Sequence, residues 1–194
     1  MDLILLEPGN KDIFGGDNSW ANGESLIDNK GDIWQGFAPP SKNLGQCFQL
    51  LSVHQGMKQQ ITTDVSNSAR TSGRPIVTEF TCVKYVDKTS VKLYEYCLRA
   101  EPLGKGAQKP SIIHILRNSG DKAANILTIS LRDVLISEIQ FQTQTDDMPT
   151  EQFKLNFTEI LWTYTVQTAD MQTPGSMHTG WSLARNRPIG DFTK

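Results

Sequence analysis

The sequence has few cysteines and histidines, no long apolar run and no excess of charge of either sign. The three cysteines, Cys47, Cys82 and Cys97, are odd in number, lie far apart and form no CxxC pair. This pattern is typical of reduced thiols in a reducing compartment. The three histidines are equally scattered, and none has a further His, Cys or carboxylate at metal-ligand spacing. The sequence therefore predicts no disulfide framework, no metal site and no cofactor.

The charge balance is almost even, with 19 Lys and Arg against 21 Asp and Glu and a formal net charge of −2. Such a chain has no strong positive field for a nucleic-acid backbone or an anionic membrane, so we expect no nucleic-acid binding. The first apolar run, residues 3–6, follows Asp2 and is too short for a signal peptide or a membrane span. We expect synthesis in the cytoplasm and no membrane insertion.

Groups that could carry catalysis do not form a recognisable set. A cysteine hydrolase needs a thiolate held by an imidazole, and only the fold could bring His54 or His114 to a cysteine. Asp146, Asp147 and Glu151 form a small acidic cluster that is best interpreted as a solvated turn. We therefore predict no catalytic residue, and a Cys/His hydrolase remains the alternative from the enzyme class.

Alternation of apolar and polar residues predicts several β-strands. Residues 112–116 and 127–131 are separated by a turn-rich stretch and read as a hairpin, and the second strand is expected to run on to residue 136. Residues 153–157 and 160–166 carry their apolar side chains in opposite parity, which predicts a bulge or sharp bend near Thr158 and Glu159. Further strands are expected over residues 48–53 and 77–86.

One helix is expected after the strand that ends near residue 86. Asp87 can accept hydrogen bonds at its start, and Val91, Tyr94 and Leu98 recur at the spacing of one helical face, with Cys97 at its edge. A single helix among many strands predicts one mainly β domain. We expect a β-barrel or sandwich with the helix packed along one side.

The connection between the strands at residues 48–53 and 77–86 is unusually long. Residues 55–74 are polar and rich in turn formers, and we expect no periodic element in residues 66–74. Long connections in compact domains are usually functional or mobile. The sequence thus predicts a long connection that is functional or mobile.

Five blocks in this chain resemble the Hcp family, the hemolysin-coregulated proteins that form the inner tube of the bacterial type VI secretion system. The most specific are the Asp-Lys-Thr-Ser turn that starts at Asp87 and the Pro-Thr-Glu-x-Phe block that starts at Pro149. The blocks occur in family order and cover residues 23–28, 77–97, 131–137, 149–164 and 180–186.

The resemblance implies a mainly β fold, an antiparallel β-barrel of two packed curved sheets flanked by one α-helix, with a long protruding loop. It also implies a non-enzymatic structural protein. Family members form homohexameric rings that stack into a tube, inside a contractile sheath and below a VgrG-type spike, and the lumen can hold small effectors. The resemblance also implies export from the bacterial cytoplasm to the extracellular space or a target cell by sheath contraction. The long connection corresponds to the family's loop that touches the next ring, so its charged residues are the candidate stacking contacts: Lys58, Asp64, Arg70 and Arg74.

The chain departs from the family pattern near its start. We treat residues 1–194 as one Hcp-like tube domain with loop insertions around residues 10–22 and 29–47. A phage-type tail-tube protein, which shares the architecture without the Pro-Thr-Glu-x-Phe block, is the remaining alternative. The sequence leaves open which effectors are carried and which residues face the lumen.

Overall fold

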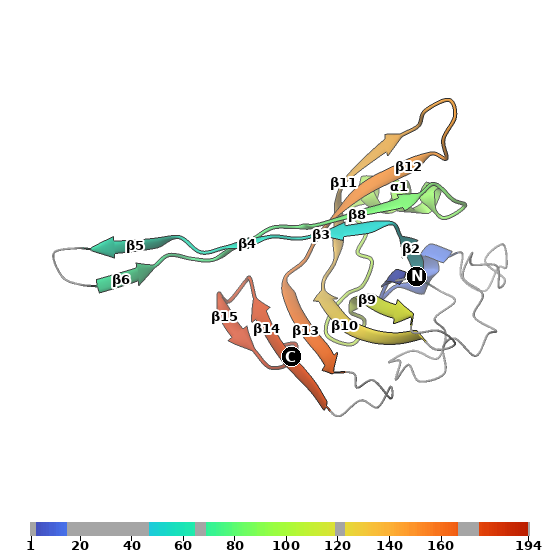
Figure 1. The fold of residues 1–194 in the computed structure, drawn as a ribbon. Coiled ribbons are helices and arrows are strands. Elements are labelled where there is room, and N and C mark those ends of the chain that lie inside the picture. Colours follow the sequence, from blue (N-terminus) through green and yellow to red (C-terminus); the bar gives the residue numbers. More distant parts are fainter. Residues whose placement is uncertain (1–2, 15–46, 65–68, 119–122, 167–174, 194) are drawn as a thin grey trace.

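A computed structural model describes residues 3–14, 47–64, 69–118, 123–166 and 175–193. In these residues the chain is mainly β with a single α-helix, and all strand pairs are antiparallel, which confirms the predicted fold class. Two sheets make up the body, and a long two-stranded arm extends from it (Figure 1). No helix in the described part of the chain is long and apolar enough to cross a membrane.

The larger sheet has seven strands in the order β15-β14-β13-β10-β9-β1-β2. Its centre is the predicted hairpin, in which Ile113 pairs with Ile129 and the apolar side chains of both point into the core. The strands are β1 Leu3–Glu7, β2 Phe48–Leu50, β9 Ser111–Asn118, β10 Ala123–Arg132, β13 Glu159–Val166, β14 Gly175–Ser182 and β15 Arg187–Ile189.

The smaller sheet has four strands in the order β11-β12-β8-β3. Phe153 and Leu155, from the run predicted over residues 153–157, are fully buried, and Lys154 between them is not, as period-two alternation requires. The strands are β3 Ser52–His54, β8 Phe80–Tyr85, β11 Leu135–Gln142 and β12 Thr150–Asn156.

The chain turns from one sheet into the other at three corners. The bend predicted near Thr158 is confirmed, since β12 ends at Asn156 and β13 begins in the other sheet at Glu159. Two expected continuous strands are broken instead. The strand that was expected to continue to residue 136 ends before Asp133, where the left-handed backbone with φ of 51° interrupts strand pairing. The strand expected over residues 48–53 is divided at Leu51 into β2 and β3. Corners of this kind let two curved sheets close over one core.

Aromatic and branched side chains from both sheets form that core. Phe48 packs beside Phe14 with ring centroids 4.9 Å apart, and Phe80 lies 5.6 Å from Phe157. Phe14 belongs to a short 3-10 helix, η1 Lys11–Phe14, which is the described part of the insertion expected at residues 10–22. Most of the insertion expected at residues 29–47, up to Cys47, lies outside the described residues.

The helix, α1 Ser90–Arg99, packs against β11 and η1 with a face different from the predicted one. Leu93 and Tyr96 are buried, whereas Val91 is 70% and Leu98 87% exposed. The predicted face of Val91, Tyr94 and Leu98 is therefore wrong. The contacts of α1 with β11 and η1 bury the face through Leu93 and Tyr96 instead.

A buried ion pair anchors the start of α1 to the smaller sheet. Lys84 Nζ lies 2.9 Å from Glu151 Oε1, and both side chains are almost fully buried. Ser90 Oγ, at the first residue of the helix, donates a 2.8 Å hydrogen bond to the same carboxylate oxygen. The interpretation of Glu151 as part of a solvated turn is therefore wrong, although Asp146 and Asp147 are exposed as expected.

Candidate functional site

The predicted protruding loop is an ordered β-ribbon, which we name the arm (residues 55–78). It contains the strands β4 Met57–Lys58, β5 Ile61–Asp64, β6 Ala69–Ser72 and β7 Ile76–Val77. The expectation of no periodic element in residues 66–74 is wrong for β6. No residue of the arm whose exposure is described, 55–61 and 73–78, is buried, and apolar alternation arises only where one face of a strand is buried, so these parts of the arm gave no periodic signal.

Backbone pairing runs along the arm from its base. Gly56 and Thr78 exchange hydrogen bonds, with Gly56 N donating to Thr78 Oγ1 at 2.8 Å and Thr78 N donating to the Gly56 carbonyl at 2.9 Å. Farther out, Gly73 N donates to the Gln60 carbonyl at 2.9 Å. The arm is thus a continuation of the β3–β8 pair of the smaller sheet, and it extends well beyond the body (Figure 1).

One contact ties the base of the arm to the larger sheet. Arg74 Nη2 donates a 2.7 Å hydrogen bond to the Leu183 carbonyl, which follows β14 directly. An open groove of about 610 Å³ lies at this junction, and Trp181 and Asn186 form its far side. Because a backbone carbonyl receives the guanidinium, Arg74 fixes the direction of the arm as well as carrying charge.

The four predicted stacking residues are spread along the arm and do not form one cluster. Lys58 lies in β4 opposite Ile76 and is exposed. Asp64 pairs with Ala69 and Arg70 with Thr63 near the far end, while Arg74 lies at the base.

The arm also exposes apolar side chains that the sequence analysis did not select. Met57 is 60%, Ile61 61% and Ile76 50% exposed. Their signal in the sequence was weak, because single apolar residues among polar ones are common on surfaces. Met57 pairs with Val77 and Lys58 with Ile76, so Met57 and Ile76 lie on opposite faces of the ribbon and do not form one apolar patch.

A second open groove, of about 330 Å³, lies on the smaller sheet and is polar. Its lining includes His54, Glu79 and Lys154. Glu79 accepts hydrogen bonds from Ser137 Oγ at 2.9 Å and from Asn156 Nδ2 at 2.8 Å. The carboxylate is thus already engaged within the sheet, and the groove offers no group arranged for acid–base chemistry.

Two of the three thiols, Cys47 and Cys82, are poorly suited to nucleophilic catalysis because they are buried. Burial, with a smaller contribution from the Glu7 carboxylate, raises the pKa of Cys47 to about 12, and burial also raises the pKa of Cys82. His114 is buried and hydrogen-bonded, with Nε2 3.2 Å from Glu7 Oε2 and Nδ1 3.1 Å from Asn125 Nδ2. It is the packed histidine that its apolar neighbours indicated. Among the described residues, no group of His, Cys, Asp or Glu is arranged to hold a metal ion.

The fold and the arm define a class: an antiparallel two-sheet β protein with one flanking helix and a long β-ribbon. Solved structures of this class match almost the whole chain. One is a type six secretion system protein, with a TM-score of 0.73, 19% identity, and coverage of 97% of this chain and 100% of that chain. A second is Hcp1 from Salmonella typhimurium, with a TM-score of 0.63, 17% identity, and coverage of 97% of this chain and 99% of that chain. A third is a type VI secretion system effector from Yersinia pestis, with a TM-score of 0.56, 19% identity, and coverage of 92% of this chain and 98% of that chain.

The family is shown by a sequence comparison. A family model described as type VI secretion system effector, Hcp, matches residues 41–164, which is well over half of the chain. This chain therefore belongs to the Hcp family, the tube proteins of type VI secretion. Comparison with curated proteins found no match.

Proposed function

We propose that this chain is a non-enzymatic tube subunit that forms homohexameric rings, and that the rings stack into a tube whose lumen carries small effectors. Sheath contraction would export the tube, tipped by a VgrG-type spike, from the bacterial cytoplasm. Membership of the Hcp family supports the proposal. The observation that carries it is the arm, a long paired ribbon that projects from the body, because a two-stranded ribbon is only marginally stable in water and contact with another molecule stabilises it further.

Ring closure and stacking make different demands on a subunit. A closed ring needs two unlike, complementary patches on each copy, and stacking needs a third contact along the axis. The sheets end in edge strands, β15 and β11, which can supply ring contacts, and the arm can supply the third. We propose Lys58, Asp64, Arg70 and Arg74 as its charged stacking contacts.

The two alternatives have weaker support. A Cys/His hydrolase would need an accessible thiolate, and the pKa of Cys47 and Cys82 is raised by burial. A phage-type tail-tube protein would share the architecture, but the Hcp family model matches across the Pro-Thr-Glu-x-Phe block that begins at Pro149. Genes for a sheath, a spike and an ATPase next to this one would separate the first proposal from the phage alternative.

The assembly is tested with the purified full-length protein. Light scattering after size exclusion is expected to give a mass about six times the 21.7 kDa of one chain, and electron microscopy is expected to show hollow rings. A mass that stays at one chain over a wide concentration range would contradict the ring. Turnover of an ester or peptide substrate that is lost on thiol alkylation would favour the hydrolase instead.

A further inference from the structure

The end of the β11–β12 hairpin projects from the smaller sheet as an exposed, acidic surface. We name residues 140–150 the tip, and it extends beyond the sheet in Figure 1. Its large apolar side chains are open to water, with Phe141 57% and Met148 61% exposed. It carries Asp146 and Asp147 and has no Lys or Arg. Acidic and apolar groups together at the end of a projecting hairpin are unusual for a surface that faces only water.

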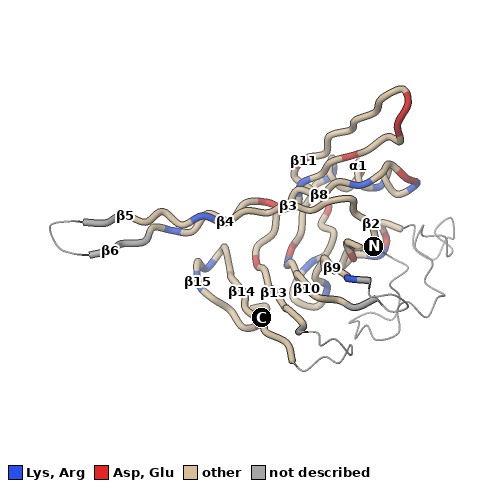
Figure 2. Tube along the Cα trace, in the orientation of Figure 1, with Lys and Arg blue, Asp and Glu red and all other residues tan. Residues whose placement is uncertain are grey.

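The turn that joins β14 to β15 has the opposite charge. We name residues 181–189 the β14–β15 surface, which includes the exposed Arg185 and Arg187 and has no Asp or Glu. Trp181 is half-buried in this surface, and it forms the far side of the open groove of about 610 Å³ together with Asn186. Figure 2 shows the basic residues of β15 and the acidic end of the β11–β12 hairpin. Opposite charge on two surfaces that also offer apolar groups favours their association and fixes its orientation.

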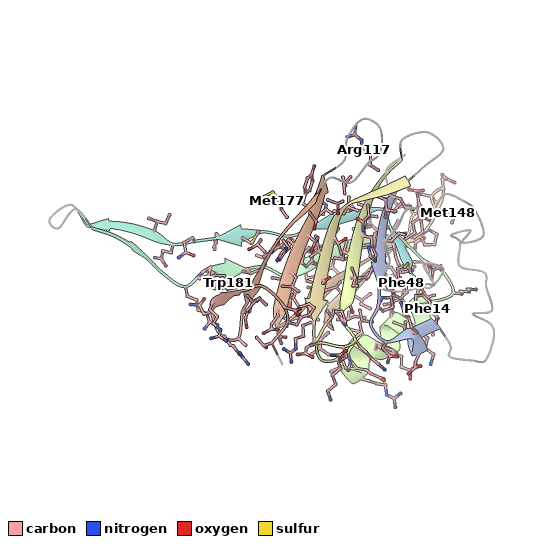
Figure 3. The ribbon with its side chains drawn as sticks, turned by 90° about the horizontal axis from the view of Figure 1, so that it is seen from below. Phe14, Phe48, Arg117, Met148, Met177 and Trp181 are labelled. Atoms are coloured by element: carbon pink, nitrogen blue, oxygen red, sulfur yellow. The ribbon has the colours of Figure 1, made fainter. Side chains whose placement is uncertain are left out.

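The tip and the β14–β15 surface lie on opposite sides of the molecule. Met148 of the tip and Trp181 of the β14–β15 surface are at opposite ends of the body in Figure 3, and the two segments are also far apart in Figure 1. One chain therefore cannot bring its own tip to its own β14–β15 surface. Two unlike, complementary surfaces on one subunit form a head-to-tail contact between copies, and such a contact generates a ring when the rotation between copies closes.

Both surfaces are held in place by hydrogen bonds within the chain. Val86 N donates a 2.9 Å hydrogen bond to the Pro149 carbonyl at the base of the tip. Leu183 N donates a 2.9 Å hydrogen bond to the Thr158 carbonyl, which ties the β14–β15 surface to the corner between the two sheets. Surfaces that are ordered before they meet lose less conformational entropy on association.

We propose that the tip of one copy docks on the β14–β15 surface of the neighbouring copy within the same ring. Opposite charge orients the two copies, and docking removes the exposed apolar side chains of the tip from water. The proposal rests on the proposed function, because it names the two surfaces that join the subunits of the ring. Both surfaces lie outside the arm, so the contact is distinct from the stacking contact.

Exchange of charge between the two surfaces tests the proposal. Sedimentation velocity of the purified full-length protein over a dilution series measures the concentration at which half of the rings have dissociated. Asp146→Lys/Asp147→Lys and Arg185→Glu/Arg187→Glu each place like charges on both surfaces, and each is expected to raise this concentration by about tenfold or more. The two changes combined in one chain restore opposite charges and are expected to return the concentration to near the wild-type value.

Further variants separate a specific contact from a change in net charge or in folding. Phe141→Ser/Met148→Ser leaves the charge unchanged and is expected to destabilise the ring as well. The control Asp12→Lys/Glu101→Lys makes the same charge change as the tip variant near Tyr96, on other elements, and is expected to leave the ring unchanged. Recovery of the ring in the charge-exchanged chain shows that each half of the exchange weakens the contact and leaves the fold intact.

A disulfide between the two surfaces tells a contact within one ring from a contact between rings. Asp147→Cys/Arg185→Cys in a Cys97→Ser background places one thiol on each surface, and the remaining cysteines, Cys47 and Cys82, are buried. Mild oxidation is expected to give a ladder of cross-linked chains on a denaturing gel that stops at six, because a ring closes on itself whereas a stack does not.

Four results would overturn the docking of the tip on the β14–β15 surface: rings of a tip variant as stable as those of the wild type, no recovery on charge exchange, no cross-linked ladder, or a ladder that continues beyond six chains. A wild-type protein that stays at the mass of one chain at every concentration would instead overturn the proposed function.

Discussion

At the scale of single residues, Glu159 stabilises the end of the chain through its charge. Its Oε1 accepts a 2.6 Å hydrogen bond from Thr193 Oγ1, and its Oε2 accepts 3.0 Å bonds from Thr193 N and Arg132 Nη1. Burial opposes ionisation of this carboxyl, but the hydrogen bonds from Thr193 and Arg132 outweigh burial and lower the pKa of Glu159 to about 2. The first residue of β13 is thereby joined to the last described residue of the chain.

This lowered pKa predicts a specific dependence of stability on pH. A carboxyl whose pKa falls from 4.5 to about 2 on folding adds stability above about pH 4.5, and that stability is lost as the pH falls toward 2. Glu159→Gln is expected to lower the free energy of unfolding at neutral pH by at most about 3 kcal/mol, with a smaller effect near pH 3. Urea unfolding at the two pH values measures the difference. Glu138→Gln, at a half-exposed surface pair with Lys154, is the matched control and is expected to change little. Equal losses at both pH values would contradict the assignment.

At the scale of elements, the helix α1 is positioned by the residues that it buries. Leu93 is fully buried between the helix and the sheet, while Leu98 is 87% exposed on the same helix. The chain reverses after Arg99 because Ala100 takes a left-handed conformation with φ of 51° and donates its N–H to the Cys97 carbonyl. Two leucines five residues apart thus have opposite environments.

The contrast between these leucines predicts the effect of truncating each. Leu93→Ala is expected to lower the free energy of unfolding by about 2–4 kcal/mol, because it leaves a cavity in a packed core. Leu98→Ala changes only an exposed side chain and is expected to cost no more than about 0.5 kcal/mol. Denaturant unfolding followed by circular dichroism compares the two. Similar losses, or a larger loss for Leu98, would contradict the packing of this helix.

At the scale of the whole molecule, the body and the arm have separate roles. The core lies between the two sheets, and the described side chains of the outer arm add little to it. Lys58 and Ile76 face each other across the ribbon, so the arm can be shortened there without a change of register. We therefore expect folding and ring formation to depend on the body, and stacking to depend on the arm.

Shortening the arm tests this separation. Replacement of residues 59–75 by Asn-Gly joins Lys58 to Ile76 through a two-residue hairpin turn, and it also removes the contact of Arg74 with Leu183. The shortened protein is expected to form rings of the same mass and to lose association between rings. Electron microscopy and light scattering measure both properties. Stacked rings without the arm, or loss of the rings themselves, would contradict the separation.

Prediction from the sequence succeeded where burial of one face of a strand produces a regular alternation of apolar and polar residues. The hairpin of β9 and β10 and the bend near Thr158 followed from alternation, because one face of each strand meets the core. The arm gave no such signal, since none of its residues 55–61 and 73–78 is buried. Glu151 was misplaced for a related reason: its partner Lys84 lies on another strand, and a short-range pattern cannot show that pairing.

The order of residues by itself determined most strands, the single helix and the family blocks, because these depend on neighbours within a few positions. Only the tertiary structure decided the corners at Leu51 and Asp133, the buried face of α1, and the pairing of residues 57–64 with residues 69–77 into an arm. Each of these depends on contacts between segments that are distant in the chain. The free energy of these contacts is gained only when the two sheets pack together, so the contacts leave no periodic pattern of apolar residues in the sequence.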